Sequence, residues 1–142
     1  MSAWLYQMSV DYWRHERYRA DVWQGADTTW DVGKIVPAEA TPQAGDIIVL
    51  YYVEAEKGVK PAERDPGIYG WGIVLWYEDK EIRYRPTSPS DYLKVNPLWN
   101  DEVNKLVDDI RGRMKQGTMW KISDKHLRDI RALVAKHASG VL

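Results

Sequence analysis

The stretch Ile47-Ile48-Val49-Leu50-Tyr51-Tyr52-Val53 decides the fold of this chain. All of its residues are apolar or aromatic, and they follow the turn-forming pair Gly45 and Asp46. An apolar run without a polar side is typical of a strand that is buried on both faces. We therefore expect residues 47–53 to form a central strand of a sheet.

Strand patterns lie on both sides of this run, and helix patterns lie before and after it. Further strands are predicted at residues 3–8, 68–77, 81–85 and 119–122, and helices at residues 10–23, after Ser9, and in two segments capped by Asn100 and Ser123. Residues 24–44 and 54–66 are predicted to be irregular connections, because glycine and proline interrupt them. This order predicts one α+β domain over residues 1–142, built around a strongly bent sheet or a small barrel.

Composition excludes several classes of protein. The 142 residues carry 20 Lys and Arg against 21 Asp and Glu, so the chain is not a histone-like basic protein. It has no cysteine, which excludes disulfides, thiolate nucleophiles and cysteine-ligated metals. No apolar run of about 18 residues occurs, so no membrane partner is expected, and a soluble cytoplasmic protein is the simplest prediction.

The sequence contains no recognisable catalytic or cofactor motif. The three histidines lack metal-ligand spacing, and there is no Walker loop or GxSxG elbow. Gly70-Trp71-Gly72 is half of a dinucleotide fingerprint, but the apolar residues after it continue a strand. We therefore predict no catalytic residue, no metal and no cofactor, and we expect these glycines to allow close strand packing or a bulge.

Basic residues are concentrated near the C-terminus. Residues 111–136 hold eight Lys and Arg and only two acidic residues. Phosphate groups bind where such charges gather, so this stretch is the candidate contact for a nucleic acid. The predicted phosphate-binding residues are Arg111, Arg113, Lys115 and Lys121.

Five segments, taken in order, resemble the EVE domain of the PUA-like superfamily, a relative of the YTH domain. They are residues 4–9 (WLYQMS), 30–34 (WDVGK), 45–52 (GDIIVLYY), 67–74 (GIYGWGIV) and 115–122 (KQGTMWKI). The resemblance implies a small curved β-barrel of about five to six strands with flanking helices. It also implies a noncatalytic reader that receives a flipped, methylated base of DNA or RNA in an aromatic cage.

The same resemblance indicates which residues form the cage. Trp30 with Gly33 and Lys34 is the nearest match to the run that forms one cage wall in the family. The rings of Tyr69 and Trp71 lie in another of the matching segments and complete the predicted base-binding set. The alternative for Trp71, which stands between two glycines, is a core or sheet-face residue.

The residues themselves point to the same kind of site. The chain has eight Trp and nine Tyr but no Phe, so every ring that it carries also has a polar group. A ring in an irregular connection can stack a base, with about 1–3 kcal/mol per stack. Gln7 and Ser9, beside the end of the first strand, are the predicted readers of the base edge. The alternative for Trp30 is an anchor that fills the end of the barrel.

Two other functions stay open at this point. A small-molecule or nucleotide-metabolite binder could use the same pocket, and the near-zero net charge favours it. An RNA-modifying or deaminating enzyme is the third possibility, and the lack of cysteine and histidine metal ligands argues against it. The sequence leaves open whether DNA or RNA is bound, which modification is read, and the oligomeric state.

Overall fold

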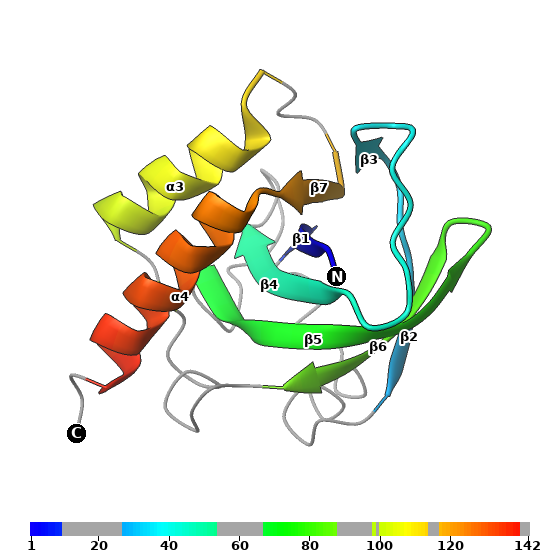
Figure 1. The fold of residues 1–142 in the computed structure, drawn as a ribbon, viewed down its shortest axis with the longest axis horizontal. Coiled ribbons are helices and arrows are strands. Elements are labelled where there is room, and N and C mark those ends of the chain that lie inside the picture. Colours follow the sequence, from blue (N-terminus) through cyan, green and yellow to red (C-terminus); the bar gives the residue numbers. More distant parts are fainter. Residues whose placement is uncertain (10–26, 54–66, 88–97, 99, 114–116, 140–142) are drawn as a thin grey trace, which may run out of the picture.

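The computed structural model describes residues 1–9, 27–53, 67–87, 98, 100–113 and 117–139. The described strands are β1 Ala3–Ser9, β2 Thr28–Asp31, β3 Ile35–Val36, β4 Ile47–Val53, β5 Gly67–Glu78, β6 Glu81–Thr87 and β7 Met119–Ile122, and the described helices are α3 Asp101–Arg111 and α4 Asp124–Ser139. The fold class is α+β, as expected (Figure 1). The predictions for residues 10–23 and 54–66 lie outside the described residues.

The strands form one mixed sheet in the order β2-β6-β5-β4-β1-β7-β3. β1 is parallel to β4 and β3 is parallel to β7, whereas the other described ladders are antiparallel. β4 is central, and its neighbouring residues Ile48 and Val49 are buried in two different apolar clusters. The prediction of a central strand buried on both faces is therefore confirmed.

The sheet is strongly curled, because only three residues join its two edge strands. β2 ends at Asp31 and β3 begins at Ile35, so these ends lie within about 15 Å of each other at 3.8 Å per residue. The N–H of Val32 in this connection donates to the carbonyl of Lys80 at the tip of the β5–β6 hairpin, at 2.6 Å. Among the described strands no ladder joins β2 to β3, so the sheet is open, with seven strands where a barrel of five to six was expected.

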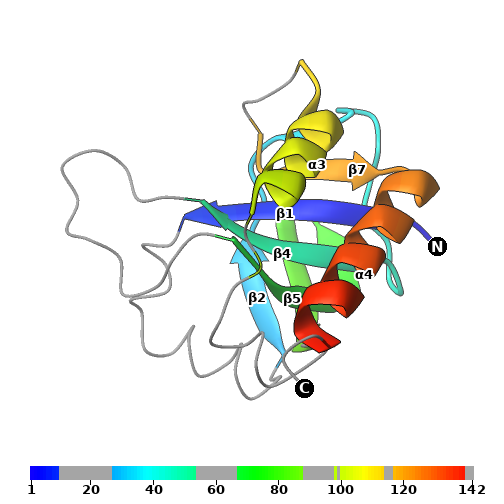
Figure 2. The same ribbon diagram turned by 90° about the vertical axis from the view of Figure 1, so that its left-hand side faces the viewer.

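Two apolar clusters fill the two sides of the curl. The inner cluster lies on the concave side and consists of Trp4, Tyr6, Val32, Ile48, Leu50, Val74, Ile82, Tyr84 and Met119. The outer cluster joins alternate residues of β1, β4 and β7 to the apolar stripes of α3 and α4, among them Leu5, Val49, Trp120, Val107 and Ile130. Both helices therefore cover the convex side of β1 and β4 (Figure 2).

The predicted helix caps are confirmed. Asn100 Oδ1 accepts a hydrogen bond from the Val103 N–H at 2.9 Å, and Ser123 Oγ accepts one from the His126 N–H at 3.1 Å. These bonds satisfy N–H groups that a helix start leaves without an internal partner. No described helix is both long enough and apolar enough to span a membrane.

Gly72 confirms the prediction of close strand packing. A Cβ at this position would lie 3.1 Å from the Arg85 carbonyl oxygen and 3.1 Å from the Tyr84 ring. The β4–β5 ladder also shifts register after the pair of Leu50 and Gly70, which is the expected bulge. These glycines serve the backbone geometry of the sheet.

Asp46 ties the start of β1 to the start of β4. Its carboxylate accepts hydrogen bonds from the Trp4 indole N–H at 3.0 Å, the Ser2 N–H at 2.9 Å and the Gln43 N–H at 2.9 Å. Burial of the carboxyl opposes ionisation, but these three donors outweigh it and hold the pKa of Asp46 below its usual value. Asp46 therefore stabilises the fold in its ionised form.

This linkage predicts an acid-dependent loss of stability. A carboxyl whose pKa is lowered by folding contributes fully above its ordinary pKa, about 3.9, and the contribution disappears as the pH falls through the lower folded-state value. Urea unfolding from neutral to acidic pH should show this loss in the wild type. Asp46→Asn should be less stable at neutral pH by about 1–3 kcal/mol, because it leaves a buried donor without its acceptor, and should lose less on acidification. Parallel pH curves for the two proteins would contradict the assignment.

Candidate functional site

The end of β1 is joined to two other segments by backbone hydrogen bonds. The Gln7 N–H donates to the Thr118 carbonyl at 2.8 Å, just before β7. The N–H groups of Thr118 and Met119 both donate to the Lys34 carbonyl, at 2.8 and 3.1 Å. Two predicted site residues, Gln7 and Lys34, are therefore held on either side of Thr118.

Gly33 packs closely against the same threonine. A Cβ at Gly33 would lie 2.6 Å from Thr118 Oγ1, a distance that only a displacement of the threonine side chain would relieve. Gly33 itself is exposed, and Thr118 is half-buried. The glycine is therefore required here for close approach of the β2–β3 connection to the start of β7.

Arg111 at the end of α3 reaches the Gln7 side chain. Its Nη1 donates to Gln7 Oε1 at 3.1 Å, and its Nη2 donates to Asp108 Oδ1 at 2.9 Å. This bond orients the Gln7 amide with Oε1 toward Arg111 and with its NH2 group, which can donate, away from it. Gln7, Thr118 and Arg111, with the Gly33–Lys34 backbone, are called the polar cluster below.

The environment of Arg111 differs from that of an exposed arginine that contacts phosphate. Its side chain is only 18% exposed, and both of its terminal nitrogens are engaged. Its Nε is buried and has no hydrogen-bond partner among the described residues. Arg111 is therefore held against Gln7 and Asp108 at a mostly buried position, and its prediction as a phosphate contact stays a prediction.

Trp30 lies on the other face of the sheet from the Gln7 side chain. It pairs with Ile82 across the β2–β6 ladder and packs, half-buried, against the inner cluster. Gln7 alternates with Tyr6, which belongs to that cluster, so the Gln7 side chain is on the convex side with Leu5. The Tyr6 hydroxyl donates to the Asp31 carbonyl at 2.8 Å, which fixes the end of β2 near the end of β1. Trp30 and the Gln7 side chain thus lie on opposite faces of the sheet.

The other predicted base-binding residues are more dispersed. Trp71 in β5 is half-buried against the outer cluster, on the same face as Gln7 and with β4 between their strands. Ser9 is the last residue of β1, and Tyr69 lies within β5. The structure thus brings Gln7, Gly33 and Lys34 together and leaves the rings of Trp30 and Trp71 on separate faces.

The predicted phosphate-binding residues are also spread over different elements. Arg113 is exposed just beyond α3, and Lys121 is exposed on β7, opposite Trp4 in the β1–β7 ladder and therefore on the concave side. Lys115 lies outside the described residues. The basic side chains of α4 are exposed on the helix layer, where Lys136 pairs with Glu102 at 3.7 Å. Within the described part of the chain, these charges do not form one continuous patch.

A groove of about 350 Å³ lies between the two helices. It is lined by Glu102, Lys105, Leu106, Asp109, Asp129, Ala132 and Leu133. Three carboxylates against one ammonium make this lining unsuitable for phosphate. No group of three or more carboxylate or histidine side chains in the described residues is arranged to hold a metal ion.

Comparison with known proteins gives a match in fold only. No protein-family model and no curated protein matches the sequence. A crystal structure of a protein from Pseudomonas putida, determined by a structural genomics consortium, is similar with a TM-score of 0.55 and 15% identity. The match covers 92% of this chain and 98% of that protein. The curled sheet with its two helices is therefore an arrangement shared with a protein of nearly the same extent.

Proposed function

We propose that this chain is a noncatalytic nucleic-acid-binding module that receives a flipped, methylated base at the rim of the curled sheet, where β1 ends. The open, curled sheet would correspond to the barrel of the EVE domain, the family that the sequence resembles. Trp30 lies on the concave side of the sheet and the polar cluster on the convex side. A base that uses both would have to reach around the rim at the end of β1, with its ring plane toward Trp30 and its edge toward Gln7.

The observation that carries this proposal is the orientation of the Gln7 amide. Arg111 holds Oε1 on its own side, so the NH2 group is the part of the amide that faces away from Arg111 and can donate to a ligand. Bases carry ring nitrogens and carbonyl oxygens that accept such bonds, and methylation of an exocyclic amine leaves those acceptors in place. A donor held in one orientation can therefore select a base edge, while a ring supplies the sequence-tolerant stacking energy.

The dispersed basic residues favour one other function. A small-molecule or nucleotide-metabolite binder needs the polar cluster but no phosphate track, and Arg111 is already engaged within the protein. The salt dependence of binding separates the two functions. For single-stranded nucleic acid, the logarithm of the binding constant falls by about 0.7 per unit of log salt concentration for each phosphate that the protein neutralises. An uncharged metabolite has no such slope, and a nucleotide has only the slope of its own phosphate groups.

Titration of short single-stranded oligonucleotides, with and without a methylated base, tests the proposal. We expect salt-sensitive binding and tighter binding of the methylated form. Arg113→Ala and Lys121→Ala should flatten the salt slope without changing the preference for the methyl group, because phosphate contacts carry no base information. Binding of the free nucleoside as tightly as the oligonucleotide, with no salt dependence, would instead identify a small-molecule binder.

Substitutions of Arg111 test its positioning role. Gln7→Ala and Arg111→Met should each weaken base binding about 3- to 10-fold, the effect of one hydrogen bond. Arg111→Lys should behave like Arg111→Met, because an ammonium does not reproduce the fork that holds both Gln7 and Asp108. Arg131→Met, on the exposed side of α4, is the charge-matched control. If Arg111→Lys keeps wild-type affinity and only Arg111→Met flattens the salt slope, Arg111 contacts phosphate directly.

A further inference from the structure

The guanidinium of Arg111 is bound on two sides by groups from different elements. Its Nη1 donates to Gln7 Oε1 on β1 at 3.1 Å, and its Nη2 donates to Asp108 Oδ1 on α3 at 2.9 Å. Asp108 lies three residues before Arg111 in the same helix and forms an ion pair with it. The three side chains are therefore linked in the order carboxylate, guanidinium, amide.

Burial makes Arg111 dependent on this carboxylate. The Arg111 side chain is 18% exposed, whereas that of Asp108 is 46% exposed. A cation that is mostly removed from water loses hydration free energy, and an adjacent carboxylate offsets this loss better than a neutral amide does. Of the two side chains that bond the terminal nitrogens of Arg111, Asp108 is therefore the one that compensates its charge.

The stability of α3 alone does not explain a carboxylate at position 108. Asp108 lies in the last turn of the helix, which ends at Arg111. The negative end of the helix dipole disfavours an acidic side chain there, whereas Asp101 and Glu102 lie in the first turn, at the favourable end. The bond with Arg111 is therefore a contact that favours the ionised form of Asp108 at this position.

The chemistry of the guanidinium fixes which end of the Gln7 amide faces outward. Arginine carries only donors, so it can bond the amide oxygen but not the amide NH2 group. A guanidinium that stays in place thus selects one of the two orientations of the amide, which differ by a half-turn and fill the same space. In the selected orientation the NH2 group of Gln7 faces away from Arg111.

We infer that Asp108 is a positioning residue, which holds Arg111 in place and through it orients the Gln7 amide with its NH2 group outward. The class of ligand follows from this orientation. The atom that Gln7 reads must accept a hydrogen bond, as a ring nitrogen or a carbonyl oxygen of a base does. The effect of Asp108 on base binding rests on the proposed function, whereas its effect on the two side chains does not.

Side-chain NMR signals of the free protein test this link without a ligand. The Arg111 Nε–H is buried and has no hydrogen-bond partner among the described residues, so its exchange with water reports whether the guanidinium stays in place. Asp108→Ala should speed this exchange roughly tenfold or more, the effect of losing one charge-assisted hydrogen bond, and should shift the Gln7 NH2 signals. Asp109→Ala removes the neighbouring exposed carboxylate and should change neither signal.

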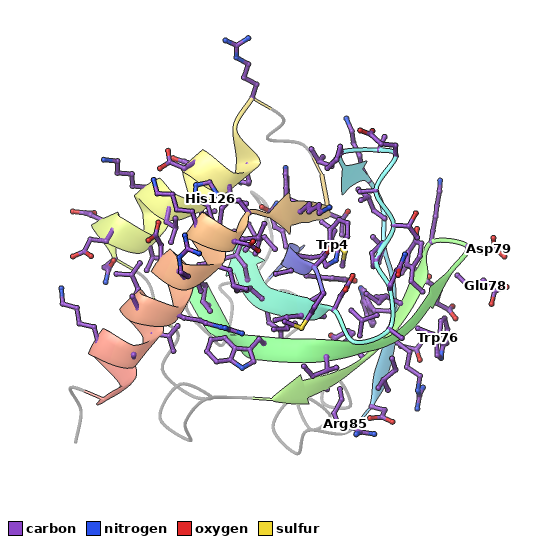
Figure 3. All side chains as sticks on the ribbon, viewed as in Figure 1. Trp4, Trp76, Glu78, Asp79, Arg85 and His126 are labelled. Carbon is purple, nitrogen blue, oxygen red and sulfur yellow. The ribbon has the colours of Figure 1, made fainter. Side chains whose placement is uncertain are left out.

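Arg85 provides an internal comparison in the same spectra. Its Nε donates to Asp27 Oδ1 at 2.8 Å, but its side chain is 61% exposed. Figure 3 shows Arg85 at the margin of the molecule, away from α3 and α4. Its Nε–H should exchange faster than that of Arg111 in the wild type, and Asp108→Ala should leave it unchanged. Equal exchange of the Arg111 Nε–H in the wild type and in Asp108→Ala would overturn the inference.

The direction of the effect on binding separates positioning from a phosphate contact. Asp108→Ala should bind the methylated oligonucleotide about 3- to 10-fold more weakly than Asp109→Ala, which removes the same charge from the same helix, because the Gln7 donor is no longer held in place. Thermal melting establishes that both variants are folded. If Arg111 instead contacts phosphate, release from Asp108 should tighten binding.

Tighter binding by Asp108→Ala, or binding equal to that of Asp109→Ala, would overturn the inference. A wild type that binds no oligonucleotide would contradict the proposed function. The exchange of the Arg111 Nε–H would then still decide whether Asp108 holds Arg111 and Gln7 in place.

Discussion

Trp4→Ala is expected to lower the free energy of unfolding by about 3–5 kcal/mol, the range for removing a large buried aromatic side chain. Trp4 is 1% exposed within the inner cluster, and its indole N–H donates to Asp46. The substitution therefore creates a cavity and also removes one of the three donors to a buried carboxylate. Urea unfolding at neutral pH measures the loss.

Two further substitutions separate these contributions. Trp4→Phe keeps most of the ring volume but loses the donor, and should cost about 1–3 kcal/mol. Trp76→Ala removes the same side chain from an exposed strand position and should cost much less than Trp4→Ala. Equal losses for Trp4→Ala and Trp76→Ala would contradict the assignment of Trp4 to the inner core.

Trp30→Ala is expected to remove the preference for a methylated base while leaving weak, salt-sensitive binding. Loss of the stacking between one base and one aromatic ring reduces the binding free energy by about 1–3 kcal/mol. Because Trp30 is half-buried against the inner cluster, the variant also loses some stability, and Trp30→Phe serves as a control that retains a ring. Titration with matched oligonucleotides carrying 5-methylcytosine, N6-methyladenine or no modification measures the preference.

The outcomes of this substitution distinguish the two interpretations of Trp30. A folded Trp30→Ala protein with unchanged discrimination would place the stacking ring elsewhere. An unfolded one would assign Trp30 to the core, as an anchor of the curled sheet. Loss of discrimination in a folded protein, with recovery in Trp30→Phe, is the expected result.

The long, regular elements of the fold were predictable because their signals are local. The strand at residues 47–53 follows from the apolar run itself. The two helix starts follow from the caps Asn100 and Ser123, each of which bonds an N–H three residues further on. The strands β2 and β3 were not predicted, since residues 24–44 show no sustained period. Both are short edge strands whose pairing is set by the distant strands β6 and β7. Such long-range ladders leave little trace in local sequence.

The candidate site was predictable only in part, for the same reason. Gln7, Gly33 and Lys34 were predicted and lie together, but Thr118, which joins them, was not among the predicted site residues. The bond between Arg111 and Gln7 spans 104 positions in sequence, and no local pattern indicates it. The basic composition of residues 111–136 suggested a patch, but alternation in β7 and the course of α4 distribute those charges over different faces.

Amide chemical shifts of the ¹⁵N-labelled chain, titrated with a single-stranded oligonucleotide that carries one methylated base, test the central claim most directly. The proposed function predicts that the signals of Gln7, Gly33, Lys34 and Thr118 shift and saturate together, and that an unmodified oligonucleotide shifts them less at the same concentration. Shifts confined to the groove between α3 and α4 or to the face around Trp76, or none at all, would contradict a base-binding site at the end of β1.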